Sequence, residues 1–149
     1  MAFEVAMVCG SVAELVFPGV VVKDLTQARD AIDPRECPVL APHLDSGFEL
    51  ASLDDMSFGS ARAKKDLRYS LTYALYFAPV DTERGLHVIT PGLWSAVSDV
   101  VTVFRDNDTL TGCQDIRPTR AVPGPVIEDP SGNKFHGALI TLTVLEHAD

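Results

Sequence analysis

The stretch RYSLTYALYF, Arg68 to Phe77, decides the fold class that the sequence predicts. Its large apolar residues occupy alternate positions: Tyr69, Leu71, Tyr73, Leu75 and Phe77. The positions between them hold Ser70, Thr72, Ala74 and Tyr76. An alternation of this length is typical of a β-strand with one face against a core, and Pro79 ends it because proline lacks an amide donor. The stretch therefore predicts a core β-strand.

A second alternating run, Phe135–Glu146, lies near the end of the chain. The residues that would share one face of it are all apolar: Ala138, Ile140, Leu142 and Val144. Before it come a short apolar run, Val126–Glu128, and the turn-forming residues Asp129–Asn133. Two such runs joined by a turn of this composition predict an antiparallel hairpin. One more strand is expected within Leu110–Ala121.

A helix is predicted between the core strand and this hairpin. Thr90-Pro91 marks its start, because threonine can cap free amides and proline suits the first helical position. The apolar residues that follow have helical spacing and form a single stripe: Leu93, Val97, Val100, Val101 and Phe104. Asp106-Asn107-Asp108 ends the helix.

The first 44 residues predict four short elements. They are a helix over Phe3–Phe17 stopped by Pro18-Gly19, a strand over Gly19–Lys23, a turn or two of helix over Asp24–Ile32 ended by Asp33-Pro34, and a strand near a sheet edge over Pro38–Leu44. Together these elements predict one α+β domain over residues 1–149. Its sheet is expected to be mainly antiparallel, with about four to five strands and with helices packed on one face.

Charge and cysteine content narrow the class of function. The chain carries 12 Lys and Arg against 21 Asp and Glu, a net charge of −9, which argues against a reader of nucleic acid. Cys9, Cys37 and Cys113 are odd in number and widely spaced, so neither a disulfide framework nor a zinc ribbon is expected. The apolar start of the chain lacks a basic residue before Lys23 and contains Glu4 and Glu14, so neither a signal peptide nor a membrane span is expected.

Residues 45–66 predict a long protruding loop. Five large apolar residues lie in it: Phe48, Leu50, Leu53, Met56 and Phe58. The only basic cluster follows: Arg62, Lys64, Lys65 and Arg68. Folding back over the core and protection of a sheet edge are the structural alternatives for these residues. Because exposed apolar clusters mark partner surfaces and long loops often bind, we expect this segment and its basic cluster to form an assembly element against another subunit.

No catalytic, phosphate-binding, dinucleotide-binding or zinc-protease motif occurs, so neither an enzyme nor a cofactor or metal site is expected. The run Asp106–Asp115 begins like a calcium loop but has Leu110 where an oxygen ligand is needed. A second hypothesis, a small-molecule-binding or hydrolytic domain, would use a pocket near His87, His136 and Tyr76.

The order of these elements resembles that of the tail terminator proteins of long-tailed bacteriophages. The likeness runs through the segments PVLAPHL, RYSLTYALYFAPV, PGLWSAVSDVVTVF and FHGALITLTVLE, including the Leu-Thr-Gly after the helix and the Phe-His-Gly-Ala that opens the last strand. The apolar start of the chain and the apolar loop depart from the family and leave open another neck component, such as a head-completion or stopper protein.

The resemblance implies a structural virion protein. It would form a ring, expected to hold six copies, that caps the tail tube, stops its growth and joins it to the head connector or stopper protein. DNA would pass through the central channel without specific binding, which an acidic wall would favour. The ring would be assembled in the cytoplasm of the host bacterium and end in the tail or neck of the virion, with no membrane partner.

Overall fold

A computed structural model describes residues 5–27, 30–43, 48–52, 65–80, 86–110, 113 and 115–148. The elements follow in the order α1 (Val5–Glu14), β1 (Val21–Val22), η1 (Pro34–Glu36), β2 (Val39–Pro42), β3 (Phe48–Ser52), β4 (Lys65–Pro79), α2 (Leu86–Asp106), β5 (Asp115–Glu128) and β6 (Lys134–Ala148).

The strands form one sheet of six in the order β1-β2-β4-β6-β5, with β3 also paired to β4. Only β1 and β2 are parallel, and the other pairs are antiparallel. The predicted α+β class is therefore confirmed. The strand beyond the expected number is β3, which lies within the segment predicted to be a loop.

The strand β4 is the central element, as the alternation in Arg68–Phe77 predicted. It pairs with β6 along its whole length, from Lys65 opposite Ala148 to Pro79 opposite Phe135. Its other side pairs first with β3 and then with β2. The predicted inward face is confirmed: Tyr69, Leu71, Tyr73 and Leu75 are buried.

The helix α2 begins earlier than the sequence predicted. Its first residue is Leu86, and Pro91 lies inside the helix, so the predicted start at Thr90-Pro91 is wrong. A proline here removes the hydrogen bond that its amide would have donated and crowds the preceding turn, but the helix continues through it. The predicted apolar stripe is confirmed, because Leu93, Val97, Val100 and Phe104 are buried.

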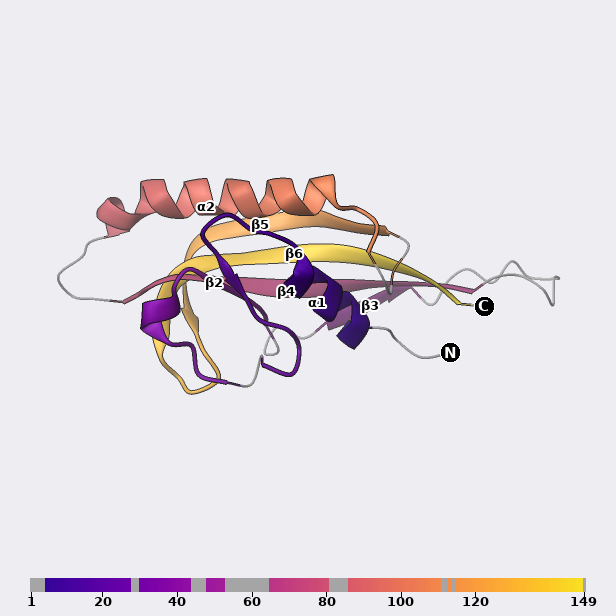
Figure 1. Cartoon of the computed structure of the whole chain (residues 1–149), viewed down its shortest axis with the longest axis horizontal. Coiled ribbons are helices and arrows are strands. Elements are labelled where there is room, and N and C mark those ends of the chain that lie inside the picture. Colours follow the sequence, from indigo (N-terminus) through magenta and orange to yellow (C-terminus); the bar gives the residue numbers. More distant parts are fainter. Residues whose placement is uncertain are drawn as a thin grey trace.

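Both helices pack against the same face of the sheet (Figure 1). One cluster of buried residues includes Val8 and Val12 of α1, Leu93 of α2, and Tyr73 of β4. The ring of Phe104 lies 5.3 Å from that of Phe17 and 5.9 Å from that of Tyr73, measured between centroids. The aromatic contacts thus join α2 to the sheet and to the segment that follows α1.

A smaller cluster covers the opposite face at the end of the sheet where β5 and β6 meet. Its buried members are Ile32, Val39, Ala41, Ala74, Tyr76, Ile127 and Phe135. Figure 1 shows the hairpin of β5 and β6 curling toward η1 at this end. The cluster is confined to this end of the face.

One prediction for the first 44 residues is wrong. Asp24–Gln27 forms a turn instead of a helix, because the Asp24 carboxylate accepts the Gln27 amide at 3.0 Å and the Thr26 hydroxyl at 2.7 Å. The strand β2 lies between β4 and the two-residue edge strand β1, so its predicted place near a sheet edge is confirmed. Its prolines are tolerated because Pro38 precedes the strand and Pro42 is its last residue.

Candidate functional site

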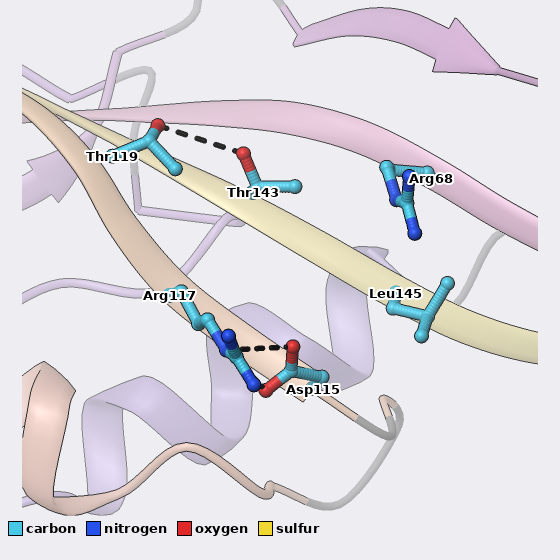
Figure 2. Close-up of a pocket in the computed structure, with 6 residues that line it drawn as sticks. All are labelled: Arg68, Asp115, Arg117, Thr119, Thr143 and Leu145. Carbon is cyan, nitrogen blue, oxygen red and sulfur yellow. Dashed lines mark hydrogen bonds and ion pairs between the residues drawn. The ribbon is translucent and has the colours of Figure 1, made fainter.

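The candidate site is a polar region on the face of β4, β6 and β5 opposite the helices. It contains a hollow of about 250 Å³ that is lined by Arg68, Asp115, Arg117, Thr119, Thr143 and Leu145 (Figure 2). The strand β6 supplies Thr143 and Leu145 to this face. The residues that alternate with them along the strand, Leu142 and Val144, are buried in the core. The alternation of the strand therefore separates a core face from a polar face.

Threonine hydroxyls connect the three strands of this face. The Thr119 hydroxyl of β5 donates to the Thr141 carbonyl oxygen at 3.3 Å, and the Thr143 hydroxyl lies 3.5 Å from that of Thr119. The hydroxyls of Thr72 on β4 and Thr141 on β6 are 3.5 Å apart. Because β-branched side chains have restricted rotamers, these residues present a stiff polar surface.

Two arginines stand at the sides of the hollow. Arg68 on β4 is exposed, and β6 lies between it and Arg117 on β5. Arg68 is opposite Leu145 and Arg117 is opposite Thr143, so the two backbones are separated by two strand spacings and a two-residue offset, about 12 Å. The Arg117 Nε lies 2.9 Å from Asp115 Oδ2, and its side chain remains 70% exposed. The site thus carries a small excess of positive charge in a chain of net charge −9.

A second hollow of about 240 Å³ adjoins the first at the edge strand β5. It is lined by Arg105, Asp108, Ile116, Arg117 and Pro118. Arg117 belongs to both hollows, so the polar region continues from the open face toward the end of α2. The arrangement offers guanidinium and hydroxyl donors to carboxylates on a partner, which is the kind of acceptor that arginine prefers.

The structure corrects the prediction for residues 45–66. Phe48–Ser52 forms β3 instead of a loop, with Phe48 opposite Leu71 and Leu50 opposite Tyr69. The apolar alternation in FELAS is compatible with a strand, and the edge of β4 beside it needs backbone partners. The rest of the segment, with Leu53, Met56, Phe58, Arg62 and Lys64, lies outside the described residues.

Two residues of the predicted basic cluster, Lys65 and Arg68, are among the residues that the structure describes. Lys65 is the first residue of β4 and its backbone pairs with Ala148. Arg68 lines the hollow on the open face. Sequence reasoning missed the residues that join it there from β5 and β6. Two patterns in the sequence could have indicated this face. They are the polar positions between the apolar residues of β6, and Arg117 and Thr119 at alternate positions of β5.

The residues proposed for a small-molecule pocket do not share one face. Tyr76 packs on Phe135, with ring centroids 5.4 Å apart. His136 follows Phe135 in β6, so strand alternation directs it to the other face of the sheet. His87 lies in the first turn of α2, and its side chain is outside the described residues.

The cysteines are poorly suited to nucleophilic chemistry. Burial, followed by the negative charges of Asp33 and Glu36, raises the pKa of Cys37 to about 11. Burial also raises the pKa of Cys9 and of Cys113. Since the thiolate is the reactive form, these thiols are protonated near neutral pH. In the described part of the chain, no cluster of three or more metal-ligating side chains occurs.

Comparisons with known proteins do not assign the chain to a family. No family model and no curated protein matches it. None of the helices within the described ranges is long and apolar enough to cross a membrane.

Proposed function

We propose that this protein is a structural component of the neck of a long-tailed bacteriophage, a tail terminator that forms a ring on the end of the tail tube. The observation that supports this proposal best is the polar face of β4, β6 and β5, which carries Arg68 and Arg117 although the chain as a whole is strongly acidic. A face of this kind fits a protein partner, because copies with a net charge of −9 need local complementarity to associate.

The order of elements supports the same proposal. The chain has a helix, a proline-flanked strand, a long central strand, a long helix and a closing hairpin, which is the order on which the resemblance to tail terminators rests. The ring would bind the tail tube protein on one side and the head connector or stopper protein on the other. A head-completion or stopper protein is the alternative within the same class.

The acidic charge suits the passage of DNA. DNA binds where lysine and arginine neutralise its phosphates and release the counterions condensed on them, and an acidic wall offers little such binding. DNA would therefore pass through the ring without being held. The role is structural and needs no cofactor, and the protein would function in the tail or neck of the virion after assembly in the bacterial cytoplasm.

The proposal is tested by the assembly state of the purified protein. Sedimentation velocity and negative-stain imaging are expected to show closed rings of one size, either alone or after addition of tail tubes. The rings should sit on tube ends and stop further polymerisation of tail tube protein. A protein that stays monomeric at high concentration, alone and with tubes, would contradict the proposal.

A further inference from the structure

Four arginines gather on the open face of the sheet and around the edge of β5: Arg68, Arg105, Arg117 and Arg120. Arg68 and Arg117 line the first hollow, and Arg105 joins Arg117 in the second. Arg120 lies opposite Thr141 of β6, and residues directly opposite in an antiparallel pair share one face of the sheet. All four are exposed, and among the described residues Asp115 is the only acidic side chain that forms an ion pair with any of them.

The two hollows form one continuous path, because Arg117 lines both. The path begins at Arg68, crosses β6 and reaches Arg117 on β5 (Figure 2). It continues into the second hollow, which is lined by Arg105 at the end of α2 and by Ile116, a residue buried on the core face. Because neighbouring residues of a strand point to opposite faces, a hollow lined by both Ile116 and Arg117 turns round the edge of β5. The name basic path is used below for the two hollows and the four arginines.

The edge of β5 is poorly suited to pairing with a further strand. Pro118 and Pro123 lack the amide that a ladder needs, and the Ile116 amide already donates to the Asp108 carbonyl oxygen at 2.9 Å. A segment bound along the basic path is therefore held through its side chains. Guanidinium groups bind carboxylates with two parallel hydrogen bonds, so acidic side chains are the acceptors that this lining suits best.

We propose that the basic path binds an extended acidic segment of the next copy in the ring. This inference rests on the proposed function and names the chemistry of the contact between copies. Charge complementarity supports it, since the path gathers exposed arginines in a chain that carries 21 Asp and Glu against 12 Lys and Arg. The acidic surface of another copy is thus always present during assembly. A path that turns round a sheet edge also fits an extended segment, whereas a rigid duplex cannot follow it.

Asp115 already makes one contact of the proposed kind within the chain. Its Oδ2 lies 2.9 Å and its Oδ1 3.1 Å from the Arg117 Nε. The terminal nitrogens of Arg117 are further donors, and the side chain is 70% exposed, so a second carboxylate can bind there. Asp115 would repel that carboxylate and compete with it for Arg117. Removing the charge of Asp115 should therefore strengthen binding of an acidic segment.

Binding of a labelled decapeptide of alternating Glu and Ser tests the chemistry. Fluorescence anisotropy at low salt is expected to show that it binds about tenfold or more tightly than the same peptide with Gln in place of Glu. An oligothymidine decamer serves as the nucleic-acid probe and should bind less tightly than the acidic peptide. Unlabelled acidic peptide should disperse wild-type rings in sedimentation velocity, because it occupies the path, and the Gln peptide should not.

Three variants locate the binding. Arg68→Gln with Arg117→Gln should weaken binding of the acidic peptide about tenfold, since two guanidinium contacts are lost. The control, Arg35→Gln with Lys134→Gln, makes the same charge change at two exposed cations outside the path and should alter binding by less than about twofold. Asp115→Asn should tighten binding about threefold, a gain that a misfolded variant cannot produce. Circular dichroism of each variant should match wild type.

The outcomes separate this inference from the proposed function. Equal binding of the acidic and Gln peptides, or acidic-peptide binding that survives in the Arg68 and Arg117 variant, would overturn the inference and leave the ring intact. Tighter binding of oligothymidine would overturn it in favour of phosphates. Rings that persist at saturating acidic peptide would overturn the assignment of the segment to the next copy. A wild-type protein that is monomeric alone and with tail tubes would overturn both the ring and that assignment.

Discussion

Asp129 joins two parts of the chain that are far apart in sequence. It is 3% exposed, and its carboxylate accepts the backbone amide of Ile32 at 2.9 Å. It also accepts the amides of Ser131 and Asn133 and the side-chain nitrogen of Asn133. One carboxylate therefore closes the β5–β6 turn and holds the segment before η1 against it.

Replacing Asp129 is expected to destabilise the fold. Asp129→Ala leaves the Ile32 amide buried without its acceptor, which costs about 2 kcal/mol in the free energy of unfolding. Urea unfolding followed by circular dichroism measures the change. Glu14→Ala, an exposed acid on α1, serves as the control and should change stability by less than about 0.5 kcal/mol.

The stabilisation by Asp129 should depend on pH. Burial raises the pKa of this carboxyl, but hydrogen bonds from Ile32, Asn133 and Ser131 outweigh burial, and the pKa lies below its usual value of 3.8. A carboxyl whose pKa is lowered on folding stabilises fully above the unfolded pKa and loses this effect as pH falls through the folded pKa. The difference between wild type and Asp129→Ala should thus be constant from neutral pH to about pH 5 and shrink below pH 4. An unchanged difference at pH 3 would contradict this assignment.

Two glycines in regular elements are expected to respond in opposite directions to the same substitution. Gly10 lies inside α1, and a Cβ there would meet no atom within 4 Å. Gly137 lies in β6, and a Cβ there would collide with the backbone carbonyl of Leu75 in β4. The strand β4 has a register shift beside this position, between Tyr76 and Ala78.

Gly10→Ala should raise the free energy of unfolding by about 0.5–1 kcal/mol, because alanine favours the helix and restricts the unfolded chain. Gly137→Ala should lower it by more than that, because the backbone of β4 or β6 must shift. Thermal unfolding of the two variants beside wild type measures both effects. Equal effects in the two variants would show that β4 accommodates a methyl group at this position.

At the scale of the whole molecule, charge should make assembly depend on salt in a way that is not monotonic. Copies of charge −9 repel over the Debye length, which is about 30 Å at 10 mM salt and about 10 Å at 100 mM. Moderate salt therefore removes the long-range repulsion first. Attraction between carboxylates of one copy and Arg68 or Arg117 of another acts over a shorter distance than this repulsion, so it weakens only at higher salt.

Assembly is thus expected to be strongest near physiological ionic strength and weaker at both 10 mM and 1 M NaCl. Sedimentation velocity at one protein concentration across this range measures it. Assembly that keeps strengthening up to 1 M NaCl would indicate that apolar contacts dominate the interface and would count against the role given to the two arginines.

The sequence by itself determined the regular elements whose pattern is local. The alternation in Arg68–Phe77 and Phe135–Glu146 fixed β4 and β6, and the stripe from Leu93 to Phe104 fixed the inward face of α2. Side-chain periodicity is a property of a single strand or helix, so it can be read without knowing the neighbours. The start of α2 was missed because a proline at the first helical position and one in the second turn look alike in sequence.

Only the tertiary structure decided what depends on pairing between distant segments. Phe48–Ser52 becomes β3 because β4 offers it an unpaired edge, and Asp129 is buried because Ile32 reaches it from 97 residues away. The site on the open face likewise exists only through the register that places Arg117 opposite Thr143 and Arg68 opposite Leu145. The alternation excludes a shift of one residue, because that shift would turn the apolar face outward. A shift of two residues would keep the faces and separate these side chains, and no local pattern in the chain decides between such registers.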